Sequence, residues 1–267
     1  HEILQLHAQD KPLHKDLDLE KIARGTPGFS GADLENLLNE AALLAAREHK
    51  DKIEEEDIEQ ARDKVLMGLK RESLMLTEEE CRLLAYHESG HALIAAILPQ
   101  ADPIHKVTIV PRGRAMGVTQ QFPEKDKYIY SREYMLDRLA VMMGGRAAEQ
   151  RVAQTTTSGA ENDLKQATQL ARRMVLDWGM SEKMGPLAFG EHDDQVFLGQ
   201  EIAQRRPYSE ETARQIDKEI KTILRNAYDR ACQVIEDRRD QLDQLAEILL
   251  EREEIPGDEV LSLVETE

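Results

Sequence analysis

Apolar residues recur every three to four positions along most of this chain, which is the spacing of amphipathic helices. The most informative of the predicted helices covers residues 77–98. Thr77 followed by Glu80 forms a capping box, and no proline interrupts the pattern before Pro99. At about 100° per residue, one stripe of this helix contains Leu84, His87, His91, Ile94 and Leu98. The pattern therefore directs two histidines toward a hydrophobic core.

Residues 1–66 are predicted to form a small helical unit. Its four helices are a first one that carries Ile3, Leu4 and Leu6, and three more at about residues 16–23, 30–49 and 54–69. Ser30 and Asp33 cap the third helix, which follows a turn-rich segment at residues 25–29. The pattern alone is also compatible with a four-helix scaffold that carries no chemistry.

The hydrophobic period changes to two after the histidine helix. Val107 and Ile109, and then Met116 and Val118, alternate as two strands around a basic turn at residues 111–114. An edge strand next to a metal helix can pair with an extended peptide, because main-chain hydrogen bonds bind any sequence. A structural β-layer without a ligand is the alternative. A further helix is expected from Ser131 to about Gln150.

Two long helices are predicted at the C-terminal end, after a loop or lid at residues 179–207 that is rich in glycine and proline. The acidic stretch 192–194 in this loop is expected to be exposed rather than a second metal site. The first helix, residues 209–237, has the coiled-coil-like series Ile216, Ile220, Ile223, Ala227, Ala231 and Val234. The second carries Leu242, Leu245, Leu249 and Leu250. These faces could pack on the chain's own core or between subunits. The predicted fold class is mainly α with a small β-layer.

Composition agrees with a helical fold, since aromatic residues make up only 4% of the 267 residues and charged helix formers are abundant. This length allows one large or two modest hydrophobic cores. The net charge of −17 argues against nucleic acid or an anionic membrane surface as the main partner. Cys81 and Cys232 lie far apart and outside any Cys-x-x-Cys pair, which favours a reducing compartment.

Nothing in the sequence resembles a membrane anchor. No apolar run approaches the ~20 residues that span a bilayer, and no signal peptide is visible. The chain begins without an initiator methionine and already inside a helical pattern. We therefore expect it to be part of a longer protein.

The stretch HESGH at residues 87–91 carries the candidate chemistry. Two histidines four positions apart lie on one face of a helix, so both imidazoles can reach one ion. A glutamate beside the first histidine, Glu88, can then take a proton from a water at that ion. The alternative is a pair of hydrogen-bonded core histidines with Glu88 as a solvated helix charge. Spacing and burial favour a zinc site.

A third ligand has to come from elsewhere in the chain. Position 97, where a third histidine of another zinc-protease pattern would stand, is isoleucine. The candidates are His105, Glu149, Glu161 and Asp163. A helix is predicted from residue 155 to about Trp178, and its apolar stripe contains Asp163, Ala167, Leu170, Met174 and Trp178. An aspartate centred on an apolar stripe is costly to bury without a cation, so Asp163 is preferred over the other three, with a buried Arg or Lys as the rival explanation.

Four segments in this order resemble the FtsH family of membrane-anchored AAA+ zinc proteases over essentially the whole chain. They are TPGFSGADLENLLNEAALLAAR at 26–47, AYHESGHA at 85–92, HKVTIVPRGRAMGVT at 105–119 and TSGAENDLKQAT at 157–168. The resemblance implies that residues 1–66 are the C-terminal helical lid of an AAA+ module and that residues 67–267 are a mostly helical zinc metalloprotease domain.

The resemblance also implies the roles of individual residues. It makes His87, His91 and Asp163 the ligands of one Zn²⁺ and Glu88 the general base. The substrate-binding edge would be Met116, Gly117, Val118 and Thr119, and the nucleotide contacts would be His7, Gly31 and Ala32. It further implies a homo-hexamer that degrades unfolded, membrane or regulatory proteins. The parent protein would be anchored in the bacterial plasma membrane, or in an organellar membrane, through N-terminal helices absent here. This part of it would lie on the cytoplasmic side.

Two features depart from the family pattern. Ser89 stands where the family usually has alanine, and it is expected to have little effect because it lies on the far side of the helix from the ligands. No Gly-x-x-x-x-Gly-Lys-Ser/Thr sequence and no Walker B strand occur in the chain. We therefore expect ATP and Mg²⁺ to act only in the intact parent protein and not in this part of it.

An alternative function, of a different class, is that of an assembly or adaptor module with structural or no zinc. The long C-terminal helices, the helical lid and the acidic surface would suit such a role. A structural zinc normally has four protein ligands and no open position. The sequence offers three convergent ligands and a base, which favours a zinc endopeptidase.

Overall fold

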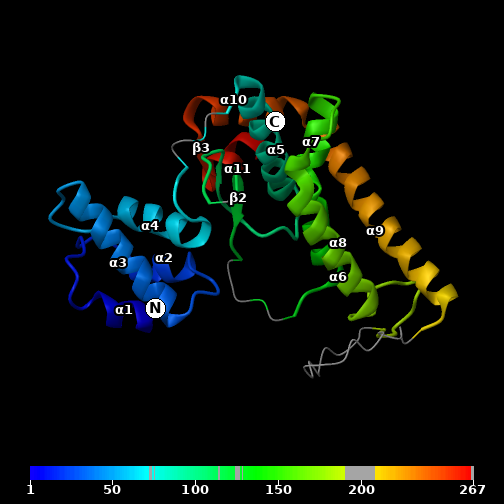
Figure 1. The fold of residues 1–267 in the computed structure, drawn as a ribbon, viewed down its shortest axis with the longest axis horizontal. Coiled ribbons are helices and arrows are strands. Elements are labelled where there is room, and N and C mark those ends of the chain that lie inside the picture. The colour runs from blue at the N-terminus through cyan, green and yellow to red at the C-terminus, as the bar shows by residue number, and fades with distance from the viewer. Residues whose placement is uncertain are drawn as a thin grey trace.

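Two groups of helices, each with its own hydrophobic core, make up the computed structural model (Figure 1). It describes residues 1–71, 74, 76–113, 115–123, 127, 129–189 and 208–265. Most of the predicted loop at 179–207, including residues 190–207 with the acidic stretch 192–194, lies outside these residues, as does Arg114 of the predicted turn. The mainly helical fold class with a small β-layer is confirmed.

The first core holds four helices together: α1 (Glu2–Ala8), α2 (Leu19–Arg24), α3 (Gly31–Arg47) and α4 (Glu55–Met67). The capping box of Ser30 and Asp33 is present at the start of α3, as predicted. Helix α2 begins later than the expected residue 16, because the Asp18 side chain accepts hydrogen bonds from the backbone N–H groups of Glu20 and Lys21 and so caps the helix there.

The second core is built around α5 (Glu78–Ile97), the helix that the sequence pattern singled out. Helices α6 (Arg132–Met142), α7 (Gly144–Val152), α8 (Glu161–Leu176), α9 (Glu210–Asp237), α10 (Arg239–Arg252) and α11 (Gly257–Glu265) surround it, and a short 3₁₀ turn, η1 (Ser158–Ala160), precedes α8. The regularly spaced apolar residues of α9, from Ile216 to Ala231, are buried in this core rather than left exposed for another subunit. Helix α11 was not predicted.

The single helix expected over residues 131–150 is wrong, because the chain breaks at Met143 into α6 and α7. The break places the start of α7 directly against the middle of α5. A Cβ atom on Gly90 would lie 2.5 Å from the carbonyl oxygen of Gly144, and one on Gly144 would lie 2.7 Å from that of Gly90. Only glycine allows two helix backbones to approach this closely.

A small antiparallel sheet lies beside α5, with strand order β2-β1-β3 (Figure 1). Its strands are β1 (Ile104–Thr108), β2 (Val118–Gln121) and β3 (Glu254–Pro256). Val107 of β1 is opposite Thr119 on one side and Ile255 on the other. The first two strands were expected, although Met116 precedes β2, whereas β3 pairs with β1 from a segment about 150 residues further along the chain and was missed. Among the described residues, the outer edge of β2 has no partner strand.

A buried ionic cluster joins α4 to the sheet. Lys106 on β1 lies 2.7 Å from a carboxylate oxygen of Asp63 on α4, and both side chains are buried. Arg112 lies 3.3 Å from the same carboxylate.

No helix in the described part of the chain combines the length and apolarity that crossing a membrane requires.

Candidate metal centre

Helix α5 carries the two histidines into the core, as the apolar stripe predicted. The Thr77 hydroxyl accepts a hydrogen bond from the backbone N–H of Glu80, whose carboxylate accepts one in return from the N–H of Thr77. From Ala85 to Ala95 every residue of the helix is buried. Glu88 is therefore not a solvated helix charge, and two ionisable histidines lie where water cannot compensate them.

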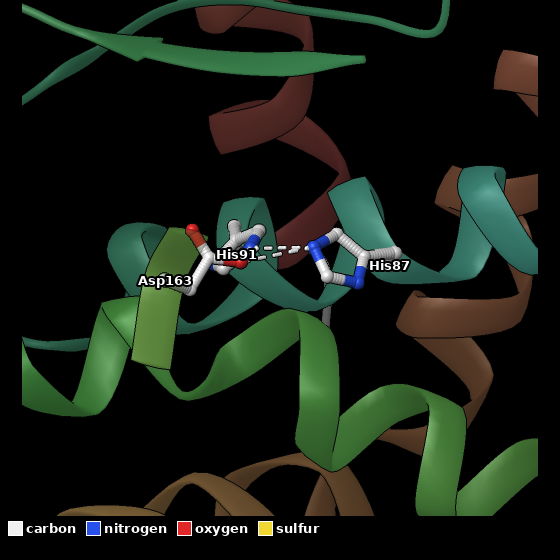
Figure 2. Close-up of side chains that lie close together, drawn as sticks. All are labelled: His87, His91 and Asp163. Atoms are coloured by element: carbon white, nitrogen blue, oxygen red, sulfur yellow. Dashed lines mark hydrogen bonds and ion pairs between the residues drawn. The ribbon is translucent and has the colours of Figure 1, made fainter. Parts of the chain in front are cut away.

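Three potential ligand atoms converge in this core. The Nε2 atoms of His87 and His91 are 3.1 Å apart, and one carboxylate oxygen of Asp163 lies 3.2 Å from the first and 3.4 Å from the second. Figure 2 shows the two rings and the carboxylate facing one another, with Asp163 reaching across from the first turn of α8. Within the described residues, these are the His, Cys, Asp or Glu side chains grouped closely enough to hold a metal ion.

The outer nitrogens of both rings are occupied. The Nδ1 of His91 donates to the carbonyl oxygen of Val141 at 2.7 Å, and the Nδ1 of His87 donates to the carboxylate of Glu149 at 2.8 Å. In the neutral imidazole this leaves the lone pair on Nε2 in each ring. Two lone pairs and a carboxylate then face one point, an arrangement that only a positive species can hold together.

The electrostatics of the three groups agree with that requirement. Burial lowers the pKa of His87, but hydrogen bonds to Asp163 and Glu149 outweigh it and raise this pKa to about 10. Burial raises the pKa of Asp163, yet the hydrogen bonds from His87 and His91 hold it well below its usual range. The two carboxylates therefore stabilise a positive charge at His87.

Glu149 lies behind His87 rather than in the group of converging ligands. Its carboxylate is buried and accepts three hydrogen bonds: from His87, from the backbone N–H of Thr157 at 2.8 Å and from the Thr157 hydroxyl at 3.1 Å. Glu149 was predicted only as a possible ligand, and its contact with His87 was not predicted. The only available signal was its buried position on the predicted helix, because 62 residues separate it from His87.

The Glu88 side chain points toward β2 of the sheet. Its carboxylate accepts a hydrogen bond from the Thr119 hydroxyl at 2.9 Å. A Cβ atom on Gly117 would lie 2.7 Å from Glu88 Oε1, so the absence of a side chain at Gly117 makes room for the carboxylate. Burial raises the pKa of Glu88, and His91 and His87 oppose this rise. The start of β2 thus holds a carboxylate that is predisposed to accept a proton.

The other candidates lie elsewhere. His105 on β1 contacts Glu59 and Arg62 of α4, and the exposed Glu161 pairs with Lys165. Of the expected substrate edge, Val118 and Thr119 are in β2, whereas Met116 and Gly117 precede it. The residues expected at the nucleotide lie in the first helical unit, His7 on α1 and Gly31-Ala32 at the start of α3.

Comparison with known proteins gives a consistent result. The family model described as peptidase family M41 matches residues 74–263, and that of the AAA+ lid domain matches residues 16–60. The chain is 61% identical over 264 residues to ATP-dependent zinc metalloprotease FtsH 2 of Salinibacter ruber, and 52% identical over 266 residues to ATP-dependent zinc metalloprotease FtsH of Thermotoga maritima. These alignments cover 99% of this chain but 39% and 44% of the relatives, so the chain spans about 40% of their length. The M41 family model covers more than half of the residues and includes the whole histidine helix. The chain therefore belongs to peptidase family M41.

Proposed function

We propose that this chain is a zinc metalloendopeptidase in which His87, His91 and Asp163 hold the metal and Glu88 acts as the general base. The observation that carries the proposal is the convergence of three ligand atoms on one point, with a buried carboxylate next to them. Two neutral nitrogens and one carboxylate oxygen are a donor set that Zn²⁺ accepts in catalytic sites. The lone pairs that face one another require such a cation, so the residues fit the metal.

The number of donors favours catalysis over a structural role. Structural zinc sites are closed by four protein ligands, whereas catalytic sites use three and keep a position open for water or substrate. In the described part of the chain the group contains three donors. When bound, zinc supplies Lewis acidity toward the attacking water and the scissile carbonyl.

The chain's own residues perform the remaining tasks. Glu88 accepts a proton from the attacking water and passes it to the nitrogen of the leaving amine, a role that suits a buried carboxylate with a raised pKa. The Thr119 hydroxyl orients that carboxylate. Glu149 and the carbonyl of Val141 orient the two imidazoles and select their tautomers. The free edge of β2 pairs with the main chain of an extended substrate, so sequence selection along this edge is loose.

We further propose that residues 1–66 are the lid of an AAA+ module and that residues 67–267 are the peptidase. In this proposal the chain is the proteolytic part of an ATP-dependent, membrane-anchored homo-hexamer that degrades unfolded, membrane or regulatory proteins. His7, Gly31 and Ala32 would contact the nucleotide in the intact protein. The matches to an AAA+ lid at residues 16–60 and to relatives named ATP-dependent proteases support this assignment.

Metal content and proteolysis, measured on the same samples, test the proposal. Wild type should bind about one zinc per chain and cleave casein in a chelator-sensitive manner. Asp163→Ala should lose both properties, and Glu161→Ala, a matched change two residues away, should keep both. Glu88→Gln should keep zinc and lose cleavage. Turnover by Glu88→Gln would refute its role as base, and zinc retained by Asp163→Ala would remove it as a ligand.

The competing function is an assembly or adaptor module. The long helices α9 and α10 suit it, although their regularly spaced apolar residues are largely buried in the chain's own core. If the wild-type chain, after zinc repletion, neither retained zinc nor cleaved casein, this second function would replace the first.

A further inference from the structure

A cavity of about 270 Å³ opens beside the candidate metal centre. Two of its lining residues contact the proposed machinery, and a third lies about one helical turn from it. Thr119 donates to Glu88, the carbonyl of Val141 accepts from His91, and Gln166 is three positions after Asp163 on α8. A side chain of a peptide paired with β2 would therefore enter this cavity close to the bond that is cleaved.

The cavity continues into a second one of about 290 Å³. The two share the lining residues Asp102, Gln121, Tyr134 and Arg138, and the second also reaches Pro27 in the first helical unit. Together they form a continuous depression, here called the Arg138 groove. It leads from the metal centre past the C-terminal end of β2 toward the helical unit at residues 1–66.

In the part of the chain that the structure describes, the charges that line the Arg138 groove are not balanced. Asp102 is already paired, with the Lys127 ammonium at 2.8 Å and with the hydroxyl of Tyr134. Arg138 is exposed and has neither a hydrogen bond nor an ion pair within the described residues. Among the described residues that line the groove, one carboxylate thus faces two cations, in a chain whose net charge is −17. A guanidinium that none of the described residues pairs with, at the wall of a cavity, can bind an anionic group that enters it.

We propose that Arg138 is a specificity-determining residue that selects a glutamate or aspartate side chain of the substrate next to the scissile bond. A guanidinium offers planar, paired donors that match a carboxylate, and the bond is strengthened because both partners are charged. The apolar part of the cavity, at Ala101, Val141 and Met142, accommodates the methylene groups of such a side chain. A lysine at the same substrate position meets a like charge.

The strand geometry places the selected side chain. Successive residues of a strand rise by about 3.3 Å, so Gln121 lies about 7 Å beyond Thr119 along β2. The acidic residue therefore occupies one of the first two substrate positions on the side of the cleaved bond that lies toward Gln121. This is the amino-terminal side when the peptide runs antiparallel to β2.

The inference rests on the proposed function, and peptide cleavage tests it with the zinc-loaded chain. Internally quenched peptides would carry Glu, Gln or Lys at each of the two positions before and after the cleaved bond. For wild type, we expect kcat/KM for Glu to exceed that for Gln by about three- to tenfold on one side of the bond, as for a charged hydrogen bond at a partly exposed site. Arg138→Gln should bring this ratio close to one, and Arg138→Glu should invert it in favour of Lys.

The control variant is Arg172→Gln, which removes an arginine of α8 that is also exposed but does not line the groove, and it should keep the wild-type ratio. Cleavage of all peptides at equal rates, or a ratio that Arg138→Gln leaves unchanged, would overturn the role of Arg138 while leaving the peptidase function intact. If wild type cleaved neither the peptides nor casein, the proposed function would fail, and this inference with it.

Discussion

Replacing Glu149 with glutamine would test how much of the metal centre depends on a residue that does not reach the metal. The side chain keeps its shape but loses its charge and one of its two acceptor oxygens. The remaining oxygen can still accept from Nδ1 of His87. The new NH₂ group then takes the place of the oxygen that accepts from the backbone N–H of Thr157 at 2.8 Å, so two donors face each other.

The magnitude follows from these contacts. Loss of the ionised acceptor weakens the hydrogen bond that orients His87, and a bond to a charged group contributes about 1.5–3 kcal/mol. Since 1.4 kcal/mol corresponds to a factor of ten, zinc affinity should fall by about tenfold to a hundredfold, which is the usual effect of removing a partner of a metal-binding histidine.

Competition with a chromogenic chelator would measure the zinc dissociation constant, and kcat/KM for a peptide at saturating zinc would show whether the loss is restricted to metal binding. Glu161→Gln is the matched control, since Glu161 is exposed and pairs only with Lys165 in the described structure. Thr157→Val removes the hydroxyl that donates to Glu149 at 3.1 Å and accepts from the backbone N–H of Gly159 at 3.0 Å, but it keeps the backbone N–H that donates to Glu149, so it should have a smaller effect on zinc affinity. A zinc affinity of Glu149→Gln within twofold of wild type would refute the reasoning.

Three further changes test packing and buried charge through the free energy of unfolding, measured with denaturant. Ser89→Ala should stabilise the protein by about 1 kcal/mol, because the Ser89 hydroxyl is fully buried and has no hydrogen-bond partner in the described structure; a loss of stability would contradict this. Gly90→Ala should destabilise by about 3 kcal/mol, since its methyl group would lie 2.5 Å from the carbonyl oxygen of Gly144, and an unchanged midpoint would show that α5 and α7 separate freely. Asp63→Asn should cost about 3 kcal/mol, because among the described residues the remaining carboxylate near the buried Lys106 is the more distant Glu254 at 3.4 Å, and a near-neutral result would mean that water reaches this cluster.

Ser89 differs from the sequence-based expectation in the environment of its side chain. The residue was expected to matter little because it lies away from the ligands. The structure places its hydroxyl in the packed protein interior next to α5, where a polar group without a hydrogen-bond partner among the described residues costs free energy. Its effect is therefore expected on stability rather than on catalysis.

Local signals were enough to predict several elements. The capping boxes at Thr77 and Ser30 start α5 and α3 where the sequence placed them, because the bonds that form a cap involve residues only three positions apart. The regular apolar spacing of α9 likewise predicted a long helix with one buried face. The apolar spacing did not predict the break at Met143, which is followed by Gly144 and Gly145 and where the start of α7 packs closely against the backbone of α5.

The sequence by itself determined which residues could form a metal centre. The i, i+4 spacing puts His87 and His91 on one face of a helix, and the position of Asp163 on the apolar stripe of α8 makes this carboxylate costly to bury without a cation, so both arguments depend on helix geometry alone. Only the tertiary structure decided that these groups meet, that Glu149 supports His87, that β3 joins the sheet and that a groove with Arg138 opens beside the site. These features come from contacts between segments tens to more than a hundred residues apart, and periodicity within one helix or strand carries no information about such contacts.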